Sequence, residues 1–257
     1  MSAPHEAGGT DGRPEPDALK RARTAAATFR VQTHRSVLYI GARVILMTAL
    51  RVWFRPEIEG RAHVPPDGAA IIAPVHRSNI DFAFMALIAD RKLFFMAKQE
   101  LWNVGWFGRL LERFGVFPVE RGGVDRASVR RAEEVLSAGA LLVVFPEGTR
   151  KSGPVGQLLD GVAFLAARSG APVVPVGISG TERAMPKGSV LPRPVKVRVA
   201  LGAPLSPSNG AGTPRPKLSE VSAMTAELRG SLQDLLSELD PPEPPRSRSQ
   251  VRKSTRA

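Results

Sequence analysis

Three short, unbroken apolar runs do most to constrain how this chain can fold. They are Ala69–Val75, Leu93–Ala97 and Ala140–Phe145, and stretches with helical spacing separate them. An unbroken run of this length indicates a strand that is buried on both faces, whereas a half-exposed strand alternates apolar and polar residues. Such strands belong to largely parallel sheets covered by helices on both sides. The pattern therefore predicts a three-layer α/β domain.

The remaining pattern completes a mixed, mostly parallel central sheet flanked by helices. Shorter apolar stretches predict four more strands, at residues 57–60, 116–119, 172–178 and 195–201. The last of them alternates apolar and basic residues, which is typical of an edge strand. Apolar residues at helical spacing predict helices at residues 82–90, 101–114, 126–138, 155–169 and 221–239. Together these elements define a folded domain over residues 56–240.

The amino-terminal part of the chain differs in composition from this domain. Residues 1–17 are rich in Gly, Pro and acidic residues, so we expect a disordered tail. Residues 18–55 are expected to form membrane-associating helices that precede the domain. Within them, Ser36–Phe54 is the most hydrophobic segment of the chain.

Segment 36–54 has the length of a membrane span but contains Arg43 and Arg51. An arginine near the middle of a bilayer costs roughly 2.5–3.5 kcal/mol on insertion scales. We therefore expect a helix that lies in one leaflet, with both arginines directed toward lipid headgroups. A helix packed on the protein core and a true membrane span are the two alternatives.

The charge balance indicates a phosphate-rich partner. Lys and Arg total 36 against 24 Asp and Glu, which gives a net charge of +12. Such an excess suits nucleic acid, an anionic membrane or a phosphorylated substrate. Residues 241–257 place basic residues among Pro and Ser, so we expect a disordered basic tail. The sequence has no cysteine, which excludes disulfides, thiol catalysis and thiolate metal sites.

The first apolar run leads into a polar loop that carries a potential catalytic pair. His76 follows the run directly, and Asp81 comes five residues later. Open α/β sheets bind their ligands at the carboxyl ends of the strands, where this loop begins. If Ser78 or Asn79 caps the next helix, Asp81 lies in its first turn and can reach back to His76. An imidazole held by a carboxylate is suited to act as a general base.

Polar residues also follow the other strands that are expected to end at this edge. Lys98 follows the run at 93–97, Arg121 follows the strand at 116–119, and the run at 140–145 leads to Arg150. Guanidinium groups suit phosphate because their planar fork can donate two hydrogen bonds. The turn at 148–149 adds backbone N–H groups, and glycine at 148 permits close approach of the backbone. The edge is thus expected to hold a phosphorylated molecule beside a base.

Four sequence blocks resemble those of the glycerolipid acyltransferases. HRSNID at 76–81 resembles the H-x4-D motif of that family, and GVFPVER at 115–121 resembles its second block. FPEGTR at 145–150 matches the third block, and VPV at 174–176 resembles the fourth. Order and spacing agree over residues 57–178. The resemblance implies 1-acyl-glycerol-3-phosphate acyltransferase activity, which forms phosphatidate in phospholipid biosynthesis.

The resemblance also implies roles for the catalytic pair. His76 would remove the proton from the free hydroxyl of the acceptor, and Asp81 would hold the imidazole ring and balance its charge. The resulting alkoxide would attack the thioester carbonyl of acyl-CoA or acyl-ACP directly. No acyl-enzyme is needed, and the G-x-S-x-G motif of serine acyl-enzymes does not occur in the chain. The acyl donor is a co-substrate, and neither a cofactor nor a metal is expected.

The substrate-binding residues follow from the second and third blocks. Arg121 and Arg150 would hold the phosphate of the acceptor, and Glu147 would orient an arginine or a substrate hydroxyl. Further contacts are expected from Gly148, Thr149 and Lys98. One departure concerns the acceptor, because the family often has a basic residue just before the glycine that opens the following helix. Residues 158–161, LLDG, offer none, so another lyso-lipid or glycerol-3-phosphate is the alternative acceptor.

The expected partners are a lysophospholipid, acyl-CoA or acyl-ACP, and an anionic membrane surface. We expect a monomer located at the cell membrane, monotopic or peripheral on its cytoplasmic face. Nucleic acid is not expected, because the chain shows no recognition helix or RNA-binding motif. Two other functions stay open at this point. A metal-dependent phosphohydrolase would need more ligands than His76 and Asp81, and a non-catalytic lipid-binding protein would not need that pair.

Overall fold

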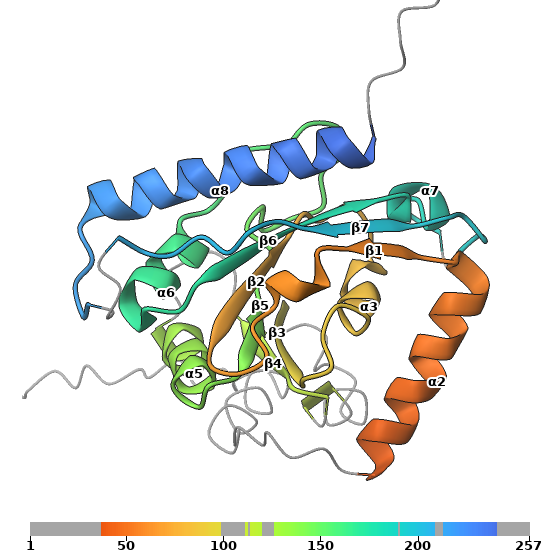
Figure 1. Ribbon diagram of the computed structural model, residues 1–257, viewed down its shortest axis with the longest axis horizontal. Coiled ribbons are helices and arrows are strands. Elements are labelled where there is room, and N and C mark those ends of the chain that lie inside the picture. Colours follow the sequence, from red (N-terminus) through yellow and green to blue (C-terminus); the bar gives the residue numbers. More distant parts are fainter. Residues whose placement is uncertain are drawn as a thin grey trace, which may run out of the picture.

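A seven-stranded sheet forms the centre of the computed structural model, which describes residues 37–98, 111–112, 114–119, 126–189, 191–208 and 213–240 (Figure 1). The strand order within these residues is β1-β7-β6-β2-β5-β3-β4. Every neighbouring pair is parallel except β6 and β7, which are antiparallel. This confirms the predicted mixed, mostly parallel sheet. The strands are β1 (Glu57–Glu59), β2 (Ala70–Pro74), β3 (Leu93–Lys98), β4 (Val116–Val119), β5 (Leu141–Val143), β6 (Val173–Ser179) and β7 (Arg198–Leu201).

Helices lie on both sides of this sheet. On one side α5, α6 and α8 pack against the strands and one another, and α3 lies on the other side, with α2 beyond it (Figure 1). The three predicted layers are therefore present. The helices of the described residues are α2 (Val37–Phe54), α3 (Asp81–Met85), α5 (Arg126–Ser137), α6 (Gly161–Ser169), α7 (Thr181–Ala184) and α8 (Leu218–Leu239), with a 3-10 turn at Arg61–His63.

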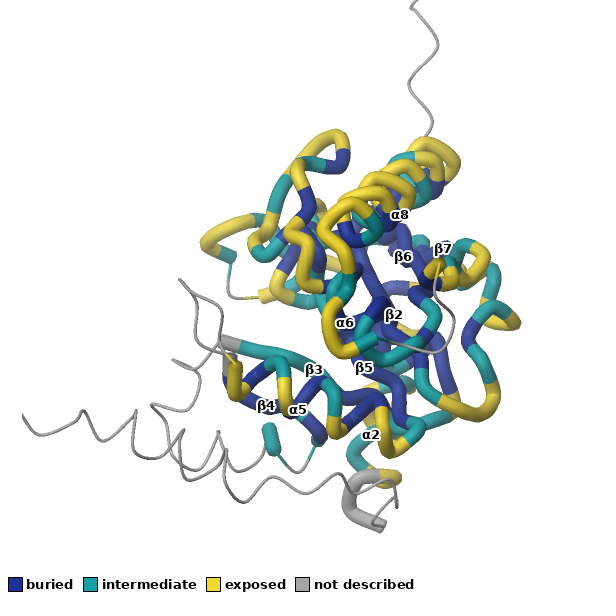
Figure 2. The backbone as a smooth tube through the Cα atoms, turned by 90° about the vertical axis from the view of Figure 1, so that its left-hand side faces the viewer, coloured by how far each residue is buried: buried dark blue, intermediate teal, exposed yellow. Residues whose placement is uncertain are grey.

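The core lies along the central strands. Every residue of β2, β5 and β6 is buried, as the dark tube in Figure 2 shows. β2 can be buried throughout only because helices cover both of its faces. The apolar runs of the sequence therefore identified the central strands correctly.

The helix after the His76 loop differs from its prediction. α3 covers only Asp81–Met85. Its N-cap residue is Ile80, whose side chain makes no capping hydrogen bond. Ser78 does not cap it, because its hydroxyl donates instead to the carbonyl of Met185, at 2.8 Å. The prediction of a Ser78 or Asn79 cap was thus wrong, whereas Asp81 does lie in the first turn.

Two other predictions about elements are corrected. The strand at 195–201 is not an edge strand, because the three-residue β1 pairs with β7 on its outer side. Lys196 contributes to this pairing by an ion pair of 2.5 Å with Glu57. The helix predicted to begin at residue 155 begins at Gly161 instead. Residues 155–159 have no regular secondary structure.

α2 packs one side against the domain. Leu50 and Phe54 are buried, and the Phe54 ring meets Phe84 of α3 edge-on at 5.3 Å between centroids. Arg43 does not point toward headgroups as predicted: only 12% of its side chain is exposed, and it donates to three carbonyls that follow α3. Unpaired carbonyls at the end of a helical segment attract a guanidinium, which explains its direction. Arg51 is exposed.

The other side of α2 leaves apolar side chains exposed. None of the helices within the described ranges has both the length and the apolar character needed to cross a bilayer. The predicted tails at 1–17 and 241–257, the predicted helix before residue 37 and most of the one at 101–114 lie outside the described residues. The exposed apolar side chains are Ile40, Val44, Ile45, Leu46, Val52 and Trp53.

Candidate active site

The carboxyl ends of four neighbouring strands meet at one edge of the sheet. β2, β5, β3 and β4 lie side by side and are parallel, so the chain leaves all four in the same direction. β2 leads into the His76 loop, and β5 leads into the turn at 145–150. The structure therefore brings the predicted loops to a common edge.

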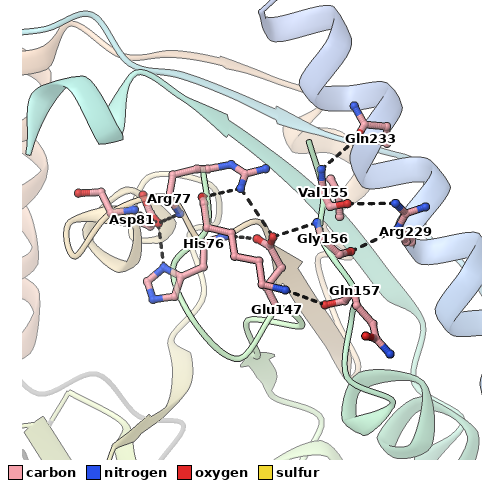
Figure 3. A network of polar contacts seen from close by, with 11 residues as sticks. His76, Arg77, Asp81, Glu147, Val155, Gly156, Gln157, Arg229 and Gln233 are labelled. Atoms are coloured by element: carbon pink, nitrogen blue, oxygen red, sulfur yellow. Dashed lines mark hydrogen bonds and ion pairs between the residues drawn. The ribbon is translucent and has the colours of Figure 1, made fainter. Parts of the chain in front are cut away.

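His76 and Asp81 form a close pair at this edge. The imidazole Nδ1 lies 2.9 Å from Oδ2 of Asp81 (Figure 3). The same carboxylate oxygen accepts the backbone N–H groups of Arg77, at 2.6 Å, and Ser78, at 2.7 Å. Asp81 is completely buried, whereas 20% of the His76 side chain is exposed. A carboxylate only accepts hydrogen bonds, so Nδ1 is the donor and Nε2 keeps its lone pair for a substrate.

Phe145 supports the imidazole from another side. Its ring lies 4.4 Å from that of His76 between centroids, with the two planes tilted by 36°. Phe145 begins the turn after β5, so this contact joins the two loops. The imidazole is thus held by a hydrogen bond from its own loop and by a ring contact from the neighbouring loop.

Glu147 lies behind His76 and is wholly buried. Its Oε2 accepts the backbone N–H of His76 at 2.9 Å, and its Oε1 lies 3.6 Å from Nη1 of Arg77. Arg77 is also buried, and it donates from Nη1 to the carbonyl of Lys151 at 2.6 Å. Glu147 was expected to orient an arginine or a substrate hydroxyl. The arginine beside it is Arg77, which the sequence analysis did not single out.

The turn after Glu147 runs beside the catalytic loop. Lys151 donates its backbone N–H to the carbonyl of His76 at 2.9 Å. Thr149 and Arg150, just before it, are exposed at this edge. Gly148 has φ of 63°, and a Cβ there would lie 2.7 Å from Cδ1 of Leu159. Both observations explain the glycine without reference to a substrate.

The structure describes two of the predicted substrate-binding residues, Lys98 and Arg121, only in part or not at all. Lys98 is the last residue of β3 and is in register with Val119 of β4, so its backbone lies at the same edge. Its side chain is not described. Arg121 lies outside the described residues, two positions after the end of β4.

Residues 55–179 match the family model described as Acyltransferase. The matched range covers 125 of the 257 residues, just under half of the chain. It includes the His76 loop, the turn at 145–150 and six of the seven strands described. The four blocks that suggested this family from the sequence all lie inside the matched range.

Two curated relatives support the same family. The 1-acyl-sn-glycerol-3-phosphate acyltransferase of Bacillus subtilis is 30% identical over 120 residues, which cover 46% of this chain and 60% of that protein. The protein of the same name from Pseudomonas aeruginosa is 29% identical over 136 residues, covering 51% of this chain and 52% of that protein. The chain thus spans only about half to three-fifths of the length of these relatives.

A solved structure has the same fold. The crystal structure of the 1-acyl-sn-glycerophosphate (LPA) acyltransferase PlsC from Thermotoga maritima aligns with a TM-score of 0.60 and 24% identity. The alignment covers 88% of each chain, so the similarity in fold extends beyond residues 55–179.

Arg77 is the main residue of the candidate site that sequence reasoning missed. It stands directly after His76, but charged side chains are rarely buried unless they are paired. Its partner, Glu147, is 70 residues away in the sequence. The only signal was the place of both residues in blocks that resemble the family motifs, and this did not indicate that they meet.

Proposed function

We propose that this protein transfers a fatty acyl group from acyl-CoA or acyl-ACP to the free hydroxyl of 1-acyl-glycerol-3-phosphate, forming phosphatidate. The observation that carries the proposal is the His76–Asp81 pair, with a buried carboxylate at 2.9 Å from Nδ1 and an imidazole that is partly exposed. The names of the curated relatives support the same reaction.

The reaction begins when Nε2 of His76 takes the proton of the acceptor hydroxyl. The oxygen attacks the thioester carbonyl, and a tetrahedral intermediate forms with a new C–O bond. Its collapse breaks the C–S bond, and the imidazolium returns the proton to the departing thiolate. Asp81 stays ionised throughout and stabilises the imidazolium. Base catalysis of this kind is typically worth about 10²–10⁴-fold.

The acceptor phosphate is assigned to Arg150 and Arg121. Arg150 is exposed beside the His76 loop, as a residue that receives a phosphate must be. Lys98 adds positive charge at the same edge, and Thr149 is available as a hydroxyl donor. Glu147 is buried beneath the catalytic loop, so in this proposal it orients the loop and does not touch the acceptor.

The protein works, in this proposal, as a monomer on the cytoplasmic face of the cell membrane. The exposed apolar side of α2 would enter the headgroup region of one leaflet, and the net charge of +12 would favour anionic lipid. Both substrates of the reaction carry long acyl chains, which makes a membrane surface the natural place to meet them.

A different acceptor of the same reaction is favoured by one observation. Leu159 is 63% exposed and lies against Gly148, where the family often has a basic residue nearby. An apolar side chain there lowers the positive charge available to a phosphate monoester. The alternative acceptor that this observation favours is therefore another lyso-lipid, whose headgroup is not a phosphate monoester.

The test is a panel of lyso-lipid acceptors with labelled acyl-CoA or acyl-ACP, read by mass spectrometry. We expect labelled phosphatidate from wild type and at least a 100-fold lower rate from His76→Ala. A His76→Ala variant that is folded and turns over near the wild-type rate would reject the assignment. The double variant His76→Ala/Asp81→Ala tests whether the protein only binds lipid. If wild type turns over no acceptor in the panel and the double variant binds lipid as tightly as wild type, a non-catalytic lipid-binding protein is favoured.

A further inference from the structure

Glu147 connects the catalytic loop to a second segment, residues 155–157 (Figure 3). One of its carboxylate oxygens accepts the backbone N–H of His76 at 2.9 Å. The other accepts the backbone N–H of Gly156 at 3.4 Å. Since the carboxylate is wholly buried, its position depends on these contacts and on Arg77. A displacement of Gly156 is therefore passed through Glu147 to the backbone of His76.

Segment 155–157 depends on other elements for its own position. It has no regular secondary structure, so its backbone groups need partners from elsewhere. Lys151 supplies one of them, since its ammonium group donates to the carbonyl of Gln157 at 3.3 Å. The side chain of Val155 is buried and anchors the segment on the core.

Three further partners come from two side chains of α8. Oε1 of Gln233 accepts the backbone N–H of Val155 at 2.9 Å. Arg229 donates from Nη2 to the carbonyl of Val155 and from Nε to the carbonyl of Gly156, both at 3.2 Å (Figure 3). Arg229 and Gln233 are one helical turn apart, so they reach the segment from the same side of α8.

α8 is a rigid support for these contacts. Its residues Leu228, Leu232 and Leu235 are buried, and the helix packs on α6 and on β6 and β7 of the sheet. Arg229 and Gln233 stand between these buried residues along the helix. Packing of the buried residues therefore fixes the direction in which the two polar side chains point. Functional groups supported from packed helices and strands hold their geometry better than groups supported from loops alone.

We propose that Arg229 and Gln233 are positioning residues for acyl transfer, acting through segment 155–157 and Glu147 on His76. The inference rests on the proposed function, because it assigns the two side chains to the alignment of the base. Neither side chain touches a reacting atom. Displacement of a catalytic group by about 1 Å can lower a rate roughly 10²-fold, so the effect is expected on kcat and not on KM.

Gln233 allows a matched pair of substitutions. Gln233→Leu keeps the approximate size but removes the acceptor for the N–H of Val155, whereas Gln233→Glu keeps an acceptor oxygen. We expect kcat to fall roughly tenfold in the leucine variant, with KM for donor and acceptor unchanged. The glutamate variant should stay within about twofold of wild type. A merely structural role would lower the melting temperature of the leucine variant and leave the kcat of its folded fraction unchanged, which would overturn the proposal.

Arg229→Ala is tested against Arg130→Ala, which removes an exposed arginine from α5. Amide hydrogen exchange of residues 76–78 and 155–157 is measured by mass spectrometry in both variants. We expect faster exchange of both segments in Arg229→Ala only, because the carbonyls of residues 155 and 156 lose their donors.

The exchange measurement needs no substrate, so it separates two failures. Wild-type exchange at residues 76–78 in Arg229→Ala overturns the positioning role, whatever the activity. A wild-type protein that transfers no acyl group to any acceptor in the panel overturns the proposed function instead. Faster exchange together with a lower kcat in Arg229→Ala supports the positioning role.

Discussion

Replacement of Asp81 by Asn tests the catalytic pair with the smallest change in shape. Oδ2 of Asp81 accepts three hydrogen bonds, from Nδ1 of His76 and from the backbone N–H groups of Arg77 and Ser78. All three are strengthened by the negative charge of the carboxylate. The amide of the variant keeps one oxygen but carries no charge.

The hydrogen bonds of Asp81 set an upper bound on the free energy of unfolding that the Asp81→Asn substitution removes. Hydrogen bonds to charged groups contribute about 1.5–3 kcal/mol each and neutral ones about 0.5–1.5 kcal/mol. Each bond is weakened by about 1–1.5 kcal/mol, so the three together amount to a loss of at most about 4.5 kcal/mol. The amide also avoids the desolvation of a buried charge, so this value is an upper bound. Domains are typically stable by about 5–15 kcal/mol, and Asp81→Asn should fold.

The expected loss of activity has a different cause from the loss of stability. An amide does not compensate the charge of the imidazolium and no longer selects the tautomer with Nδ1 protonated. We expect kcat/KM for lysophosphatidate and acyl-CoA to fall roughly 10²–10⁴-fold, which is about 2.7–5.4 kcal/mol of transition-state stabilisation. The rate is measured by release of free thiol, with circular dichroism to establish folding. Asp90→Asn is the control, since the Asp90 side chain is 86% exposed. A folded Asp81→Asn variant within tenfold of wild type would refute the reasoning.

Three further predictions concern stability and membrane binding. Gly148→Ala should lower the free energy of unfolding by about 1–2 kcal/mol, measured by urea titration, because the new methyl group meets Leu159 in left-handed backbone. Ile45→Asp should weaken sedimentation with phosphatidylglycerol vesicles without changing the circular dichroism spectrum; unchanged sedimentation would contradict the placement of α2. Arg43→Ala should lower the melting temperature by several degrees, for a loss of about 1–3 kcal/mol, because three carbonyls lose their donor, whereas Arg51→Ala should not.

The central strands were predictable because burial on both faces leaves a direct mark on the sequence. β2 and β6 are apolar at almost every position, and no other common element of that length shows this pattern. The flanks of the sheet were less predictable. The segment that contains β7 alternates basic and apolar residues like an edge strand, yet β1 pairs with it. Glu57 of β1 forms ion pairs with Lys196 and Arg198 of that segment. A three-residue strand such as β1 leaves too short a pattern to reveal that pairing.

The contact between His76 and Asp81 was predictable because both residues lie in one short segment. Five residues separate His76 from Asp81, and a loop followed by a helical turn brings such residues together. The support of the pair was not predictable, because its members come from distant segments. Glu147 reaches the loop from the turn after β5, and Arg229 and Gln233 reach segment 155–157 from a helix that begins at Leu218.

The direction of Arg43 shows how the proposed membrane surface and the catalytic pair are related. The guanidinium of Arg43 bonds the carbonyls that follow α3, and Phe54 of the same helix contacts Phe84 within α3. α3 begins with Asp81, so α2 packs directly on the short helix that carries the carboxylate paired with His76. An arginine directed toward headgroups would give α2 no such attachment. The side of α2 that packs on the domain is therefore partly polar, and its apolar side is exposed. The packing also fixes the position of this apolar side relative to His76 and Asp81.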